Sequence, residues 1–347
     1  MKDNILSFES ILKIDIHAHI FFESQKFINW ARESDLRFMN ICAFGLHLGR
    51  MEFMEALAER LWKKYPELLA FCSTFDLTRR EDRHYHDHVK DWLSQSYKAG
   101  ACMTKIWKEV GMEIKDKTGQ YLLPDNPLFD PIYRHIQEYG KILIAHLAEP
   151  IDSWRPLNKD SLMHGYLTRY PEWHVHNRPN FPRYEQIIAA RDHILSKHPK
   201  LIMIGAHLGS MEHDLTEIAK RFDQYPNFYV DTAARTGWLT LQPSNKVRQF
   251  FVKYQDRILF GTDYNSGIPE DTEKIEEKVF SDIEIVEEIK KTDSRYRRDF
   301  QYYTGQGTML YGNKQIECLN LPQKTLDRFF YKNALNIVPG LYPDLKI

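Results

Sequence analysis

The stretch that decides the fold is Lys13-Ile14-Asp15-Ile16-His17-Ala18-His19-Ile20, near the N-terminus. Apolar residues alternate there with Asp15, His17 and His19, and this period of two predicts a strand with all three polar side chains on one face. Two imidazoles side by side can occupy two ligand positions of a borderline-soft divalent metal. The stretch therefore predicts a strand that begins a metal site.

Length and charge narrow the class of protein. The chain has 347 residues, enough for one large α/β barrel, and its net charge is -1. The sequence pI of about 7.0 indicates no overall attraction to nucleic acid or to an anionic membrane, so we expect a small-molecule partner. The N-terminus lacks a signal pattern and no apolar run is long enough to span a membrane, which predicts a cytoplasmic protein.

Short apolar, β-rich runs alternate with amphipathic segments along the chain. Eight runs read as strands: 13–20, 37–44, 68–76, 101–107, 141–147, 200–208, 227–232 and 257–262. Six segments read as helices: 52–65, 86–99, 131–139, 183–198, 211–225 and 244–254. This alternation predicts a distorted (β/α)8 TIM barrel.

We expect one domain over residues 1–347, because no segment has the composition of a flexible linker. Two long excursions interrupt the repeat, at about 148–182 after the fifth strand and about 264–322 after the eighth. The second holds an acidic helix near 273–291. Both leave the carboxyl ends of strands, where barrel enzymes build their sites, so we expect them to form walls of a pocket. The segment 321–334 is expected to be an amphipathic helix on the barrel exterior.

Polar residues stand at the ends of most predicted strands. They are His17 and His19, Lys105, His146, His207, Asp231 with Arg235, and Asp263. Because the ends of barrel strands converge, we expect these residues to form one cluster of three-histidine-plus-aspartate type.

These motifs resemble a known family. Asp15-x-His17-x-His19, Gly205-Ala206-His207-Leu208-Gly209, Phe260-Gly261-Thr262-Asp263 and the late Asn333-Ala334 look like the amidohydrolase superfamily. More narrowly they resemble the amidohydrolase-related branch (amidohydrolase 2) that includes aminocarboxymuconate-semialdehyde decarboxylase.

The resemblance implies that one divalent metal, most often Zn²⁺, is held by a set of four ligands: His17, His19, His146 and Asp263. His207 matches the histidine beside the metal-bound water or substrate, so we assign it as base or electrophile, with Asp263 sharing proton transfer.

Three further residues have open assignments. Lys105 is either a plain amine near substrate or, as in binuclear relatives, a carbamate that bridges two metals; an ammonium would repel a second cation. Arg235 either offers a donor fork to a substrate carboxylate or pairs with Asp231 or Glu149. Glu149 itself is expected to orient a histidine ligand.

The leading interpretation is a metal-dependent hydrolase in which activated water attacks an amide, ester or lactone-type carbonyl. Non-oxidative decarboxylation of a small carboxylic acid, a lyase reaction, is the alternative, because the same ligand set serves both. A TatD-like nuclease is disfavoured by the neutral charge, and a non-catalytic metal-binding barrel by the intact ligand set. Related barrels often dimerise, so a homodimer is a further expectation.

Overall fold

All eight predicted strand positions carry strands in the computed structural model, which describes residues 6–266, 279–343 and 345. The strands are β1 (Lys13–Ile20), β2 (Leu36–Ile41), β3 (Leu69–Ser73), β4 (Met103–Ile106), β5 (Ile142–Ala145), β6 (Met203–Gly205), β7 (Phe228–Asp231), β8 (Ile258–Leu259) and β9 (Tyr264–Ser266). They form one sheet in the order β8-β7-β6-β5-β4-β3-β2-β1-β9, and every neighbouring pair is parallel. The predicted TIM-barrel-like α/β fold is confirmed.

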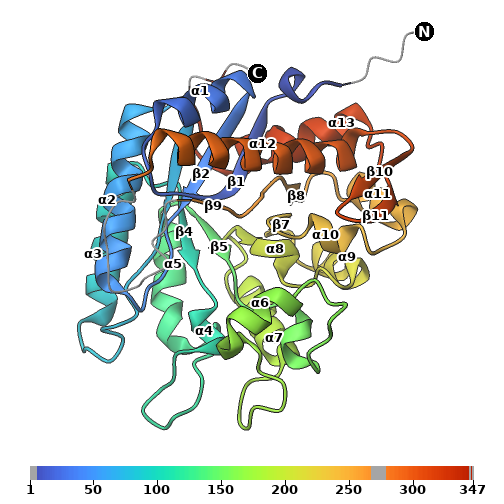
Figure 1. Cartoon of the computed structure of the whole chain (residues 1–347). Coiled ribbons are helices and arrows are strands. Elements are labelled where there is room, and N and C mark those ends of the chain that lie inside the picture. The colour runs from blue at the N-terminus through green and yellow to red at the C-terminus, as the bar shows by residue number, and fades with distance from the viewer. Residues whose placement is uncertain (1–5, 267–278, 344, 346–347) are drawn as a thin grey trace.

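Helices connect these strands on the outside of the sheet (Figure 1). They are α1 (Gln25–Glu33), α2 (Leu48–Lys64), α3 (Tyr85–Ala99), α4 (Glu109–Met112), α5 (Asp130–Glu138), α6 (His164–Arg169), α7 (Tyr184–Lys197), α8 (Ala206–Gly209), α9 (Leu215–Gln224), α10 (Thr236–Leu239), α11 (Ser244–Lys253), α12 (Asp282–Thr304), α13 (Gln323–Asp327) and α14 (Asn333–Ile337). The six predicted helices correspond to α2, α3, α5, α7, α9 and α11, with shifted ends.

The ring of strands is distorted where its ends meet. No ladder joins β8 to β1; instead β9, four residues beyond β8, pairs with β1 from Ala18↔Tyr264 onward. Two single backbone hydrogen bonds bridge the remaining gap, from Ile16 N–H to Phe260 O (2.9 Å) and from Asp263 N–H to His17 O (2.8 Å). The broken strand leaves residues 260–263 between two short strands, at the place where a metal ligand is predicted.

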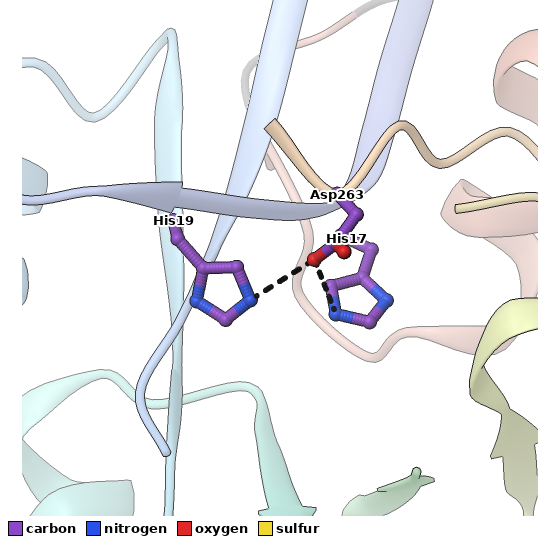
Figure 2. Close-up of side chains that lie close together, drawn as sticks. All are labelled: His17, His19 and Asp263. Carbon is purple, nitrogen blue, oxygen red and sulfur yellow. Dashed lines mark ion pairs between the residues drawn. The ribbon is translucent and has the colours of Figure 1, made fainter. Parts of the chain in front are cut away.

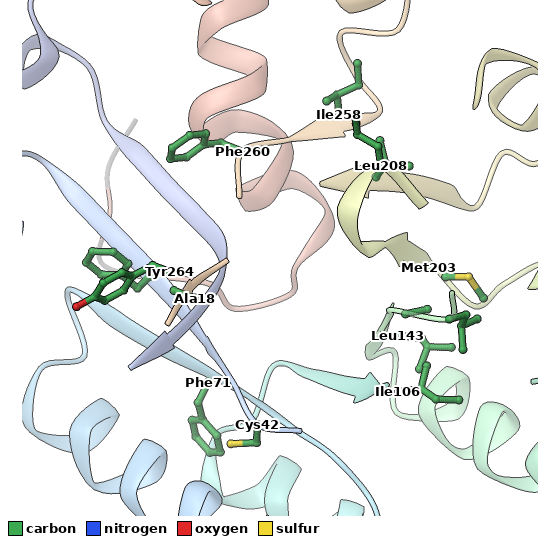
Figure 3. Close-up of a cluster of buried hydrophobic side chains, with 14 of the residues drawn as sticks. Ala18, Cys42, Phe71, Ile106, Leu143, Met203, Leu208, Ile258, Phe260 and Tyr264 are labelled. Carbon is green, nitrogen blue, oxygen red and sulfur yellow. The ribbon is translucent and has the colours of Figure 1, made fainter. Parts of the chain in front are cut away.

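Two apolar clusters lie on either side of the strands. Ala18, Phe71, Ile106 and Leu143 belong to the larger cluster, which packs the strands against the helices (Figure 3). Ile14, Ile16 and their counterparts in the other strands form a second cluster that Leu341 and Tyr342 join from the C-terminal segment. Because both faces of the sheet are covered, β1 is buried along its whole length.

One expectation about β1 is wrong. The pairing register of β1 and β2 shifts between Asp15 and Ala18. Such an irregularity reverses the alternation of side chains along a strand. His17 and His19 therefore line the cavity described below, whereas Asp15 contacts Tyr296 of α12 and is not part of its lining.

The two excursions differ in their contribution to the cavity wall. The first contains α6 and contributes Glu149, Leu162, Met163 and Tyr166 to the cavity wall. The second contains α12 and the antiparallel hairpin β10 (Thr308–Tyr311) and β11 (Lys314–Glu317). Of its described residues only Asn265 lines the cavity, so the expected second wall is not formed by 279–322. The helix expected near 273–291 starts instead at Asp282; residues 267–278 lie outside the described part of the chain.

The C-terminal helix is also interrupted. The predicted single helix over 321–334 consists of α13, a π-helical turn at Arg328–Lys332 and α14. Asn333 donates from its side-chain amide to Gln255 O (2.7 Å) and Ile258 O (2.8 Å), which ties this segment to the start of β8.

Candidate metal centre

A cavity of about 360 Å³ opens at the carboxyl ends of the strands. All eight residues predicted for the site line it: His17, His19, Lys105, His146, Glu149, His207, Arg235 and Asp263. They come from β1, from β4 and from the segments after β5, β6, β7 and β8. The converging strand ends of the barrel therefore bring together residues that are up to about 250 positions apart in the chain.

His17, His19 and Asp263 form the tightest group of potential metal ligands. Asp263 Oδ1 lies 3.6 Å from His17 Nε2 and 3.4 Å from His19 Nε2 (Figure 2). One donor atom from each of the three residues lies within 4.8 Å of the others. A divalent ion of zinc type takes imidazole nitrogen and carboxylate oxygen ligands together, so this group fits such an ion.

The backbone fixes the orientation of two imidazoles. His19 Nδ1–H donates to Ile41 O (2.9 Å), and His207 Nδ1–H donates to Ala233 O (2.8 Å). A carbonyl only accepts, so each Nδ1 must carry the proton and each Nε2 keeps a free lone pair. Such hydrogen bonds behind a histidine are typical of metal-binding imidazoles.

Asp231 fixes the orientation of the His17 imidazole. Its Oδ2 lies 2.9 Å from His17 Nδ1, and its Oδ1 accepts from the backbone N–H groups of His207 (2.8 Å) and Ala233 (3.0 Å). Asp231 is completely buried, so it is not itself on the cavity surface. Sequence reasoning placed Asp231 at a strand end but did not pair it with His17; the signal available was its position at the end of the seventh strand.

His146 brings an unused nitrogen to the cavity. Its Nε2 is buried and has no hydrogen-bond partner in the described part of the chain, and its ring centroid lies 4.3 Å from that of His207. A buried polar atom without a partner costs free energy unless a ligand satisfies it. The orphaned nitrogen fits a role as metal ligand, although His146 stands outside the compact group of His17, His19 and Asp263.

The electrostatics of the cavity favour the neutral forms of His146 and His207. Burial, followed by the charge of Arg235, holds the pKa of His207 well below its usual range. Burial and the neighbouring His207 do the same for the pKa of His146. Burial opposes ionisation of Asp263, yet its close contact with His19 and the other nearby imidazoles holds its pKa well below the usual range. Neutral imidazoles and an ionised carboxylate are the forms that bind metal.

Lys105 is buried in the floor of the cavity, with its Nζ 3.2 Å from His17 Nε2. Burial lowers its pKa, against the opposing charges of Asp231 and Asp263. A less basic amine reacts more readily with CO₂ and also repels a cation less. A second group of potential ligands, His17, His207 and Asp231, lies nearby. Both assignments of Lys105 thus stay predictions.

Arg235 and Glu149 do not have the predicted partners. Arg235 Nε lies 3.5 Å from Oε2 of the buried Glu212, and its guanidinium stacks on Trp238 at 4.8 Å. Of the two alternatives, the pairing with Asp231 or Glu149 is not formed among the described residues, since the carboxylate beside the guanidinium is that of Glu212.

Glu149 accepts hydrogen bonds from Lys108 and from Tyr166 OH (3.0 Å). Its carboxylate is used by these two groups, so the expected role of orienting a histidine is not what this geometry shows. Lys108 lies 3.6 Å from the centre of the Trp173 ring and also lines the cavity. Lys108 and Glu212 are polar residues of the site that sequence reasoning missed, although each follows a strand end within a few positions of a predicted residue.

A cavity with histidines and an aspartate at the mouth of a TIM-like barrel defines the class of metal-dependent barrel enzymes. The chain belongs to the amidohydrolase family, whose model matches residues 108–339, and it is an enzyme of that superfamily. The match includes His146, His207 and Asp263 and begins beyond Lys105. The predicted membership is confirmed.

Solved structures share this fold at low identity. A dihydroxybenzoic acid decarboxylase from Polaromonas sp. JS666, with bound manganese and the inhibitor 2-nitroresorcinol, is 12% identical, with TM-score 0.55 and 94% and 97% of the two chains covered. A 2,6-dihydroxybenzoate decarboxylase is 12% identical, with TM-score 0.53 and coverage of 94% and 99%. A 4-oxalomesaconate hydratase from Rhodopseudomonas palustris is 10% identical, with TM-score 0.52 and coverage of 96% and 97%.

The search of curated proteins found no match to this chain. Within the described residues, none of the helices combines the length and the apolar character that crossing a bilayer requires.

Proposed function

We propose that this protein is a metal-dependent enzyme that acts on a small, flat carboxylate and removes its carboxyl group without oxidation. The observation that carries this proposal is the composition of one cavity. Metal-binding groups share it with the Arg235 guanidinium and with the aromatic rings of Phe44, Trp107 and Trp238. Aromatic walls favour an unsaturated ring, and the guanidinium favours an anion.

We further propose a single divalent ion, with zinc as the first candidate and manganese as the second. His17, His19, His146 and Asp263 would hold it, since the tautomers of His17 and His19, the unpartnered Nε2 of His146 and the carboxylate of Asp263 each leave a ligand atom available. When bound, such an ion polarises a substrate oxygen and stabilises negative charge that develops on it.

The residues of the chain would do the remaining work. The Arg235 guanidinium would bind a carboxylate or other anionic group of the substrate through its fork of donors. In decarboxylation the bond between the carboxyl carbon and its neighbour breaks, the electron pair stays on the neighbouring carbon, and a proton takes the place of CO₂. Asp263, whose side chain is 33% exposed, would pass that proton from solvent.

The solved structures support this choice of substrate class. These three enzymes are named for dihydroxybenzoates and 4-oxalomesaconate, all of which are small carboxylates. Identities of 10–12% establish a common fold, so the substrate of this chain is proposed on its own cavity.

Hydrolysis is the second candidate. It is favoured by His207, a buried and neutral imidazole whose Nδ1 is tied to a carbonyl and whose Nε2 is free to take a proton from an attacking water. Three other expectations stay predictions: a cytoplasmic location, a homodimer, and one domain over the whole chain.

One labelling experiment separates the two reactions. The zinc- or manganese-loaded protein is incubated with a panel of hydroxybenzoates and related unsaturated carboxylates in D₂O, and with esters, lactones and amides in H₂¹⁸O. Decarboxylation predicts CO₂ release and one deuterium on the product carbon, whereas hydrolysis predicts ¹⁸O in the product carboxylate. Absence of both labels across the two panels, with metal bound, would refute the proposal.

A further inference from the structure

Asp263 has an unusual backbone conformation for a residue with a side chain. Its φ angle is 56°, in the left-handed region that glycine adopts more readily than other residues. Such a conformation persists where the surrounding structure holds it, and it is concentrated at functional sites. The question is which groups hold Asp263 in it.

The peptide group that joins Thr262 to Asp263 is anchored at both ends. On one side, Asp263 N–H donates to His17 O at 2.8 Å. On the other side, Thr262 O accepts from the Nη2 of Arg295 and from the backbone N–H of Ala234 (3.2 Å). Because the plane of this peptide group sets the φ angle of Asp263, these three hydrogen bonds together influence how its carboxylate is presented to His17 and His19.

Thr262 is itself held by Asp15. Its N–H donates to Asp15 Oδ1 (3.1 Å) and its hydroxyl to Asp15 Oδ2 (2.5 Å). Tyr296 OH also donates to Asp15, and it lies 2.9 Å from the Thr262 hydroxyl oxygen. Asp15 and Tyr296 are both completely buried, so water does not compete for these contacts.

Arg295 and Tyr296 are neighbours on α12, the long helix of the second excursion (Figure 1). Neither lines the cavity, so neither can touch a substrate bound there. The Tyr296 ring packs between Trp30 (5.9 Å) and Phe260 (6.0 Å), measured between ring centroids. This packing ties α12 to the barrel at the gap between β8 and β1.

We propose that Arg295 and Tyr296 are positioning residues for Asp263, through which α12 sets the affinity of the metal site. The inference rests on Asp263 being a metal ligand, as in the proposed function. It assigns a role to the second excursion that differs from a pocket wall: this helix holds the strained ligand from outside the barrel. Loss of a group behind a metal ligand typically weakens metal binding 10- to 100-fold.

The test measures binding of Zn²⁺ alone and of Mn²⁺ alone, by competition with a chelator, on the full chain. Arg295→Met removes the side-chain donor to Thr262 O and leaves the backbone donor Ala234, and Tyr296→Phe removes one hydroxyl. We expect each to weaken binding about 10- to 100-fold, with an unchanged far-ultraviolet circular dichroism spectrum. Arg295→Lys, which keeps a donor, should recover part of the loss.

Arg297→Met is the matched control. Arg297 is on the same helix but pairs with Glu9 and Asp293 (2.7 Å each) at a side-chain exposure of 45%, so its loss should leave metal affinity within twofold. Asp263→Asn tests the ligand itself. If Asp263→Asn weakens binding while Arg295→Met and Tyr296→Phe stay within twofold of the native protein, the positioning role is refuted and the metal site stands. If Asp263→Asn also binds normally, the metal site and the positioning role are both refuted.

Discussion

Asp231→Asn exchanges one oxygen of a buried carboxylate for an amide NH₂ and keeps the shape of the side chain. The amide oxygen can still accept from the backbone N–H groups of His207 and Ala233, which lie 2.8 and 3.0 Å from Oδ1. The NH₂ then faces His17 Nδ1, 2.9 Å from the present Oδ2. Two N–H groups cannot donate to each other, so His17 must accept at Nδ1 and carry its proton on Nε2, where it has no lone pair for a metal.

The structure sets the size of the effect. The side chains of His17 and Asp231 are 1% and 0% exposed, so solvent does not screen their interaction. A hydrogen bond to a charged group contributes about 1.5–3 kcal/mol, and about 1.4 kcal/mol corresponds to a tenfold change in affinity. We therefore expect Asp231→Asn to weaken zinc binding about 10- to 100-fold.

The assay is competition for Zn²⁺ against a chelator at pH 7.5, with thermal unfolding of the metal-free protein measured in parallel. Asp223→Asn is the control, because Asp223 is on α9 with a side chain 62% exposed and pairs with Lys253. A zinc affinity of Asp231→Asn within threefold of that of the native protein would refute both the ligand role of His17 and the tautomer argument.

Four further outcomes are expected. His207→Asn should keep the metal and lower kcat roughly 100-fold or more, as for loss of a proton-transfer group; loss of the metal would instead make His207 a ligand. Arg235→Met should raise KM for a carboxylate substrate about tenfold with kcat little changed, and an unchanged KM would contradict anion binding. Intact mass should show no carbamate on Lys105 if metal analysis finds one ion per chain, and a carbamate if it finds two. Burial raises the pKa of Glu55 to about 7, despite its hydrogen bond from Ser73. Between pH 4.5 and 7 the native protein should therefore lose up to about 3 kcal/mol of unfolding free energy relative to Glu55→Gln. A difference in unfolding free energy that does not change with pH, measured by urea unfolding, would contradict this.

The direction of the pH effect of Glu55 on stability follows from proton binding. Between pH 4.5 and 7 the folded chain keeps the proton that the unfolded chain has released, so rising pH favours the unfolded state. Above pH 7 both states are ionised and the difference between the native protein and Glu55→Gln should stay constant.

The positions of strands and the members of the cavity could be predicted from the sequence. Alternating or continuous apolar runs indicate strands locally, and the carboxyl ends of parallel barrel strands must converge, so His17, His146 and Asp263 were expected to meet. The resemblance to a family then suggested their chemistry.

Which buried group each side chain contacts was decided only by the tertiary structure. The register shift in β1 turns Asp15 toward Tyr296. His17 is oriented by Asp231, and not by an acidic residue nearer to it in the sequence. Glu212, not Asp231 or Glu149, lies behind Arg235. No local pattern encodes these pairs, because each depends on the packing of segments far apart in the chain. Periodicity determines which face of an element is apolar, whereas the partner of a buried polar group depends on which other segment brings a donor or acceptor within about 3 Å of it.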